Sequence, residues 1–137
     1  RDAAANGYSS LITKEKMLAW EKEHRPVGFG DVVLFRSDYT DHYFRPLPVG
    51  RRFIAEPVER KSPGWPDPDP DCMEFLASRK VMTLGTDSAS MGPLPDLAEP
   101  THYAGLKHGM IWTESATGLG QLPVTGAFYC MMGPKHK

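Results

Sequence analysis

The chain has 137 residues, of which 40% are hydrophobic and 24% are charged, and its formal net charge is -1. This length allows one domain with its own core and is too short for two ordinary domains. The near-neutral charge gives no electrostatic basis for binding nucleic acid or an anionic membrane, and the sequence has no apolar run long enough to span a bilayer. We therefore expect neither nucleic acid nor a membrane among its partners.

The cysteines and the two ends of the chain bear on its origin. Cys72 and Cys130 are too few and too far apart for a disulfide framework, and free thiols favour a cytoplasmic location, although two cysteines can still pair. The first ten residues carry no initiator Met and no apolar leader, and the last seven follow directly on a strand-like run. We expect a fragment of a longer protein.

The first predicted elements are a helix and a strand. Residues 11–24, LITKEKMLAWEKEH, are typical of a helix that Thr13 caps and Pro26 ends. After a turn that contains two glycines, residues 32–35, VVLF, form a short β-branched run. Such a run is typical of a buried strand.

A proline-rich segment follows, over residues 36–70. It contains seven prolines, but it also carries aromatic side chains that a solvated linker would not need, among them Tyr39, Phe53 and Trp65. We therefore expect an ordered excursion over a face of the domain.

The second half of the chain alternates helices with short strands. Asp69 or Asp71 can cap a helix through CMEFLASR, and VMTLGTDS is expected to be a strand that runs into a loop. A short helix around HYAGLKH, a strand GMIWTE, a glycine-rich turn and a strand GAFYCMM complete the chain. This alternation indicates an α/β domain with a mixed sheet and short flanking helices.

Two polar side chains stand out in the apolar stretch from residue 101 to residue 128. A neutral imidazole, here His102, and a carboxylate, here Glu114, are usual ligands of a catalytic divalent metal such as Zn²⁺ or Mn²⁺. His102 is expected in the first turn of a helix and Glu114 at the end of the next strand, so both side chains can reach one cleft. On spacing alone the commoner alternative is structural, with His102 capping a helix and Glu114 paired with an arginine.

The other candidates have simpler explanations. His108 precedes Gly109 at an expected helix C-terminus, where a hydrogen-bond donor is structurally sufficient, and His136 is expected at the surface. Asp87 and Ser88 follow a strand, where α/β proteins tend to place functional groups, but an Asx-type turn is the alternative. Because Ser88 lacks a Gly-x-Ser-x-Gly context, serine-hydrolase chemistry is disfavoured.

Three segments together strongly resemble one enzyme family. ITKEKMLAWEKEH…GFGDVVLFRSDY, FLASRKVMTLGTDSASMG and HYAGLKHGMIWTE…LPVTGAFYCMMGPKH are similar to the cyclase-type metal-dependent hydrolases, which include kynurenine formamidase, isatin hydrolase and enzymes that open dienelactone rings. The most specific pieces are the GTDS loop after a strand and His102 followed twelve residues later by Glu114. In two-metal members of the family, a His and a Glu or Gln at that spacing complete the metal site.

The resemblance implies the family's swivelling β/α/β fold, incomplete in this chain. Residues 1–137 would be the C-terminal part of a single hydrolase domain. The family's main metal motif, His-x-Gly-Thr-His-x-Asp with a further His, is absent, since no two of the five histidines are four residues apart. The remaining metal ligands would therefore come from an N-terminal portion of the same protein. We also expect a homo-oligomer.

The activity implied is hydrolysis by a metal-activated water, which cleaves either the C–N bond of an amide or lactam or the ester bond of a lactone, in a small and often cyclic substrate. His102 and Glu114 would be metal ligands, His102 also being counted as catalytic, and Asp87 and Ser88 would lie beside the substrate or orient the ligands. The alternative is a non-catalytic α/β binding or assembly domain in which His102 and Glu114 are a structural pair.

Overall fold

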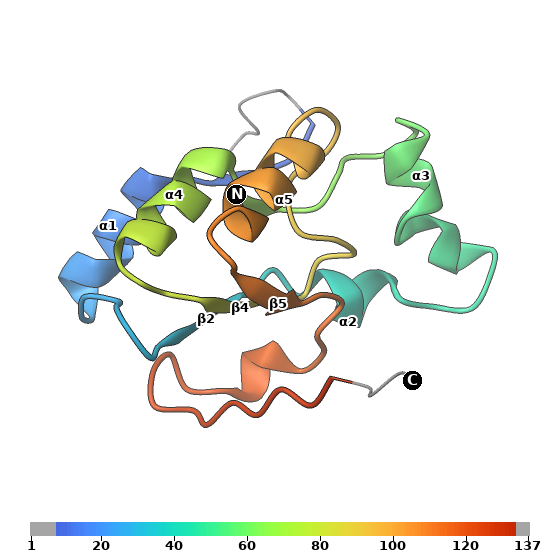
Figure 1. The fold of residues 1–137 in the computed structure, drawn as a ribbon. Coiled ribbons are helices and arrows are strands. Elements are labelled where there is room, and N and C mark those ends of the chain that lie inside the picture. The colour runs from blue at the N-terminus through green and yellow to red at the C-terminus, as the bar shows by residue number, and fades with distance from the viewer. Residues whose placement is uncertain (1–7, 134–137) are drawn as a thin grey trace.

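The structure is a computed structural model that describes residues 8–133. Its centre is a three-stranded sheet in the order β2-β4-β5, shown in Figure 1, which consists of β2 (Val32–Phe35), β4 (Thr83–Thr86) and β5 (Ile111–Thr113). Both pairs of neighbours are parallel. A separate parallel pair joins β1 (Leu11–Ile12) to β3 (Asp67–Pro68).

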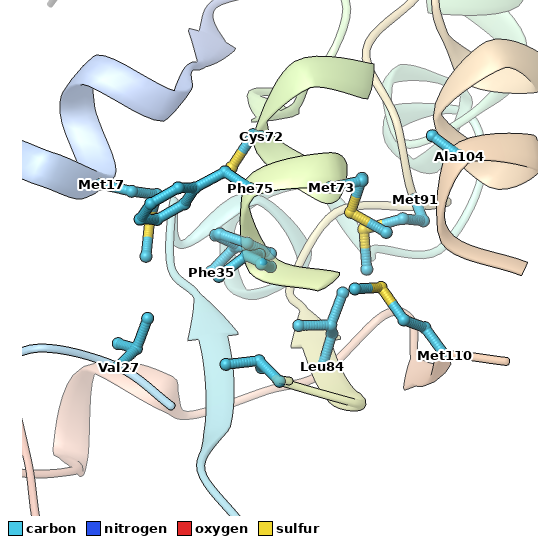
Figure 2. Close-up of a cluster of buried hydrophobic side chains, with 12 residues drawn as sticks. Met17, Val27, Phe35, Cys72, Met73, Phe75, Leu84, Met91, Ala104 and Met110 are labelled. Atoms are coloured by element: carbon cyan, nitrogen blue, oxygen red, sulfur yellow. The ribbon is translucent and has the colours of Figure 1, made fainter. Parts of the chain in front are cut away.

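Three helices cover one face of this sheet, as Figure 1 shows: α1 (Lys14–Glu23), α4 (Pro70–Ser78) and α5 (Ala98–Leu106). The main core lies between these helices and the sheet. Figure 2 shows three methionine side chains, from Met73, Met91 and Met110, gathered near Leu84. Methionine has a flexible side chain that fills irregular gaps between packed elements.

Several local predictions are confirmed. The α/β class holds, and the strand at residues 32–35 has the predicted bounds. Thr13 caps α1, and the Asp69 carboxylate caps α4 by accepting a hydrogen bond from the Cys72 backbone N–H at 2.8 Å. Both cysteines are free thiols, Cys72 buried and Cys130 exposed. Apart from these predictions, none of the described helices is long and apolar enough to cross a membrane.

Two predictions about the sheet differ from the structure. Every strand pair within residues 8–133 is parallel, whereas a mixed sheet was predicted. The predicted strand at residues 126–132 is also not formed in the described chain, and Phe128 in it is 94% exposed. A strand needs a neighbour to pair its backbone groups. No strand of the described residues pairs with this segment, so its β-forming composition alone is not enough.

The proline-rich segment, residues 36–70, contains several short elements. It contains α2 (Tyr39–Tyr43), the 3₁₀ helix η1 (Val49–Arg52) and α3 (Ala55–Val58) before it returns through β3. Its aromatic side chains build a second buried cluster, formed by Tyr39, Phe53 and Trp65. The indole N–H of Trp65 donates to the Gly92 carbonyl at 2.9 Å, which ties the return of the excursion to the loop after β4.

The cap of α4 makes a quantitative prediction. Asp69→Ala removes the acceptor for the Cys72 N–H, and we expect it to lower the free energy of unfolding by about 1 kcal/mol. Asp71→Ala is the matched control, since Asp71 is exposed, lies in the first turn of the same helix and is not its cap. Urea unfolding of both variants measures the difference. Equal losses for the two would contradict the capping role.

Candidate metal site

The candidate residues lie together at the carboxyl ends of the parallel strands. Asp87 and Ser88 directly follow β4, and Glu114 directly follows β5. The backbone N–H of Ser115 donates to the Ser88 carbonyl at 2.9 Å, so the two loops adjoin. Open parallel sheets bind ligands beyond the carboxyl ends of their strands, which makes this edge the expected place for a site.

His102 and Glu114 face each other across this edge. His102 Nε2 lies 3.4 Å from Glu114 Oε1, and their side chains are 32% and 33% exposed. The predicted position of His102 in the first turn of its helix was wrong, because α5 begins at Ala98 and His102 is its fifth residue. Pro100 lies within the first turn, where its missing N–H has no intrahelical role, so the helix starts earlier than its apolar residues indicate.

The protonation of His102 follows from its second contact. Its Nδ1 lies 2.8 Å from the Ala98 carbonyl oxygen. A carbonyl oxygen only accepts hydrogen bonds, so Nδ1 must carry a proton, and in the neutral imidazole Nε2 then keeps its lone pair. The ring is held from the side by Trp112, at 5.3 Å between centroids in a T-shaped arrangement. His102 therefore presents an acceptor nitrogen to Glu114.

Glu114 is held by one of its two carboxylate oxygens. Oε1 accepts from the Met91 N–H at 2.7 Å, from the Trp112 indole N–H at 3.1 Å and from the Ser90 hydroxyl at 3.3 Å. Within the described part of the chain, no donor contacts Oε2. The carboxylate is thus oriented through Oε1, while Oε2 stays available to a ligand.

The two side chains fit a divalent cation. His102 Nε2 and Glu114 Oε1 lie 3.4 Å apart, close enough for the two side chains to bind one cation. Imidazole nitrogen and carboxylate oxygen are ligands that both Zn²⁺ and Mn²⁺ accept. They make an incomplete set, because a catalytic zinc site takes three protein ligands. Across residues 8–133, no group of three or more His, Cys, Asp or Glu side chains is placed to hold a metal.

Asp87 and Ser88 tie the surrounding loops together. The Asp87 carboxylate, 1% exposed, accepts from the backbone N–H groups of Ser37 and Asp38 and from the Ser37 hydroxyl. These partners lie about fifty residues away at the end of β2, so the contact is not a local Asx turn. Ser88 is buried, and its hydroxyl donates to the Pro66 carbonyl at 2.7 Å. Both contacts support the loops at the edge where His102 and Glu114 meet.

Asp67 is a buried acid that the sequence interpretation missed. Its carboxylate contacts the Thr86 hydroxyl at 2.9 Å and the Gly92 backbone N–H at 2.5 Å, and none of it is exposed. Burial raises the pKa of Asp67 well above its ordinary value of 3.8. No local signal separates Asp67 from Asp69, because its burial depends on contact between β3 and the loop after β4.

The contacts of Asp67 reach Glu114 through one short loop. Residues 88–92 are held from one side by Trp65, Pro66 and Asp67, through Gly92 and Ser88. From the other side of the same loop, Met91 and Ser90 donate to Glu114. The return of the proline-rich excursion therefore helps to position the candidate ligand.

His108 lies outside this site. Its Nε2 is 2.8 Å from Glu74 Oε2, and both side chains are about 40% exposed. Lys107 contacts the same carboxylate, and these two partners hold the pKa of Glu74 below its usual value. His136 falls outside the described residues.

The position of His108 gives a control for the metal site. We expect His108→Ala to leave metal content unchanged and to alter the free energy of unfolding by no more than about 1 kcal/mol, because exposed pairs contribute little. Metal analysis by mass spectrometry together with urea unfolding measures both effects. A His108 variant that lost its metal would show that the ligands are assigned to the wrong histidine.

Comparison with known proteins identifies relatives of this fold. The family model described as "Putative cyclase" matches residues 1–93, a match that ends before His102 and Glu114. Isatin hydrolase of Roseibium aggregatum is 28% identical over 122 residues, which cover 85% of this chain and 44% of that relative, in its C-terminal part.

Two solved structures agree with this relationship. Isatin hydrolase A from Labrenzia aggregata, bound to benzyl benzoate, has a TM-score of 0.70 at 26% identity and covers 90% of this chain and 47% of that chain. Isatin hydrolase A from Ralstonia solanacearum has a TM-score of 0.69 at 25% identity. The match covers 92% of this chain and 49% of that chain. The chain thus spans less than half the length of these relatives. Since the family model covers more than half of its 137 residues, the chain belongs to the cyclase family of metal-dependent hydrolases.

Proposed function

We propose that this chain forms the C-terminal part of a single hydrolase domain, which cleaves either the C–N bond of an amide or lactam or the ester bond of a lactone, in a small and often cyclic substrate. The observation that carries the proposal is the 3.4 Å approach of the His102 imidazole to the Glu114 carboxylate, at the carboxyl edge of a parallel sheet. Because the chain belongs to a family of metal-dependent hydrolases, we interpret His102 and Glu114 as metal ligands.

The metal would be held by His102 through Nε2 and by the Glu114 carboxylate. The other ligands would come from the N-terminal portion of the fold, which the relatives have and this chain does not span. Either Zn²⁺ or Mn²⁺ accepts a set of imidazole and carboxylate ligands. When bound, such an ion lowers the pKa of a water molecule and polarises a carbonyl group.

Other residues of the chain orient the side chains of His102 and Glu114. The Ala98 carbonyl holds the proton of His102 on Nδ1, and the Met91 N–H fixes the Glu114 carboxylate through Oε1. Hydrogen bonds that fix a ligand's orientation typically change metal affinity 10- to 100-fold. Asp87 and Ser88 would not bind the metal themselves. They would act indirectly, because their hydrogen bonds hold in place the loops that surround His102 and Glu114.

The relatives support a proposal for the substrate class. One solved isatin hydrolase is bound to the product analogue thioisatinate, and isatin itself is a cyclic amide. We propose a substrate of that kind, a small ring with an amide or ester carbonyl. We further propose that the enzyme is a homo-oligomer of the cytoplasm, where free thiols such as Cys72 and Cys130 persist.

A chelation experiment separates this function from a non-catalytic binding domain with a structural His102–Glu114 pair. The complete natural polypeptide, supplied with Zn²⁺ or Mn²⁺, is expected to hydrolyse isatin or a related lactam or lactone. Dialysis against a chelator should abolish turnover, and returning the metal should restore it. Binding of stoichiometric metal without turnover of any of these rings would refute the hydrolase, and absence of metal would favour the structural pair.

A further inference from the structure

One glycine lies between the backbone groups that hold the two candidate ligands. Gly92 follows Met91, whose N–H donates to Glu114 Oε1 at 2.7 Å. It also packs against the helix that carries His102, because a Cβ atom built on Gly92 would lie 2.9 Å from the Ala98 carbonyl oxygen. That oxygen lies 2.8 Å from His102 Nδ1. The position of Gly92 therefore affects both side chains of the candidate site.

The backbone at Gly92 leaves no room for a side chain. Its φ is +92°, a left-handed conformation that residues with a Cβ rarely adopt. A Cβ atom there would also lie 2.8 Å from both Ala98 Cα and Thr101 Cβ, closer than real Cβ contacts come. Because Ala98 contributes backbone atoms, this overlap can be relieved only if α5 or the loop moves. Glycine at this position thus allows the loop after β4 to approach α5 directly.

A buried carboxylate fixes Gly92 from the other side. Asp67 Oδ2 accepts from the Gly92 N–H at 2.5 Å, and the Trp65 indole N–H donates to the Gly92 carbonyl at 2.9 Å. The residue after Asp67 contacts the helix, since the Pro68 carbonyl accepts from the Thr101 hydroxyl at 3.2 Å. One segment of the chain therefore holds both the loop and α5.

The groups that make these contacts are buried. Asp67, Met91 and Thr101 are each 0% exposed, and Figure 2 shows the Met91 side chain among the methionines of the main core. A packed interior has little free space, so a shift of one of these groups displaces its neighbours. Movement of Gly92 is therefore transmitted to both candidate ligands.

We propose that Gly92 and Asp67 are positioning residues, which set the separation of the two candidate metal ligands. That separation is 3.4 Å between His102 Nε2 and Glu114 Oε1. Asp67 fixes the backbone of Gly92, and Gly92 sets the distance between the loop after β4 and α5. The inference rests on the proposed function, because it assigns both residues a task at the proposed metal site.

Gly92→Ala in the complete natural polypeptide tests the proposal, with Gly30→Ala as the matched control. Gly30 also has a positive φ, +85°, but a Cβ atom there would meet nothing within 4 Å. We expect Gly92→Ala to weaken the affinity for Zn²⁺ about 10- to 100-fold, and Gly30→Ala to change it by less than about threefold. Competition with a chromophoric chelator measures both affinities, well below the melting temperature of each variant. Equal affinities of the two variants would overturn the proposal.

A second readout does not need the metal. The Trp112 indole N–H donates to Glu114 Oε1 at 3.1 Å, and its ring centroid lies 5.3 Å from that of His102. In the metal-free protein, we expect Gly92→Ala to shift the indole ¹H–¹⁵N resonance of Trp112 and Gly30→Ala to leave it in place. A resonance unchanged in both variants would contradict the positioning role. If the native protein binds no metal, the hydrolase proposal fails, whereas this measurement still tests the role of Gly92.

Two substitutions of Asp67 keep the test decisive if Gly92→Ala does not fold. Asp67→Ala removes the acceptor for the Gly92 N–H, whereas Asp67→Asn retains an oxygen that can accept from it. We expect the Ala variant to bind Zn²⁺ about tenfold or more weakly than the native protein, and the Asn variant to bind within about threefold of it. Native affinity in the Ala variant would overturn the proposal, and so would equal losses in the two variants.

Discussion

Glu114→Ala in the complete polypeptide is expected to lower hydrolytic turnover by about 100-fold or more and to release the metal at the same time. The substitution removes a charged ligand oxygen and also the acceptor for the Met91 and Trp112 N–H groups. Turnover of isatin and metal content, measured on the same preparation, give the two effects. A variant that kept its metal and its activity would show that Glu114 neither binds the metal nor contributes to turnover.

Glu114→Gln separates the ligand role from the loop contacts. A glutamine side-chain oxygen still accepts from the Met91 N–H, but the charge on the ligand is lost. We therefore expect Glu114→Gln to bind metal more weakly than the native chain and to keep its fold, as judged by circular dichroism. Equal metal affinity for the Gln and native proteins would argue against a carboxylate ligand.

Asp67→Ala is expected to have the largest effect on stability, lowering the free energy of unfolding by about 3 kcal/mol. It leaves the buried Gly92 N–H without its acceptor and the Thr86 hydroxyl without its partner. Asp67→Asn is the matched control, because its oxygen can accept from Gly92 while its amide donates to Thr86. We expect the Asn variant to lie within about 1 kcal/mol of the native chain at neutral pH. A loss as large as that of the Ala variant would contradict the hydrogen-bond account.

The pH dependence of stability tests the raised pKa of Asp67. The folded chain holds the proton of this carboxyl to a higher pH than the unfolded chain, whose pKa stays near 3.8. Between the two pKa values the folded state binds more protons, so the contribution of Asp67 to the free energy of unfolding is full below pH 3.8 and falls as pH rises toward the raised pKa. The difference in stability between native and Asp67→Asn proteins should change with pH in that direction. A constant difference would contradict it.

The features that local sequence determines were predictable. The strand at residues 32–35 and the caps Thr13 and Asp69 follow from patterns of a few neighbouring residues. The meeting of His102 and Glu114 was also predictable, because only a short turn connects the helix that carries His102 to the strand that ends before Glu114.

The features that depend on distant partners were not predictable. Asp87 reads as a local turn residue, yet its partners lie about fifty residues earlier. Asp67 is one of three acids in DPDPD, and only the fold buries it. The apolar run at residues 126–132 predicts a strand, but pairing needs a neighbour, and no strand of the described chain provides one.

Anomalous diffraction from crystals of the complete polypeptide grown with Zn²⁺ tests most directly whether His102 and Glu114 bind one metal. We expect a peak within about 2.2 Å of both His102 Nε2 and a carboxylate oxygen of Glu114, with further ligands from outside the present chain. A peak elsewhere, with Nε2 and Oε1 still 3.4 Å apart and no ion beside them, would contradict the metal site and leave the two residues as a structural pair.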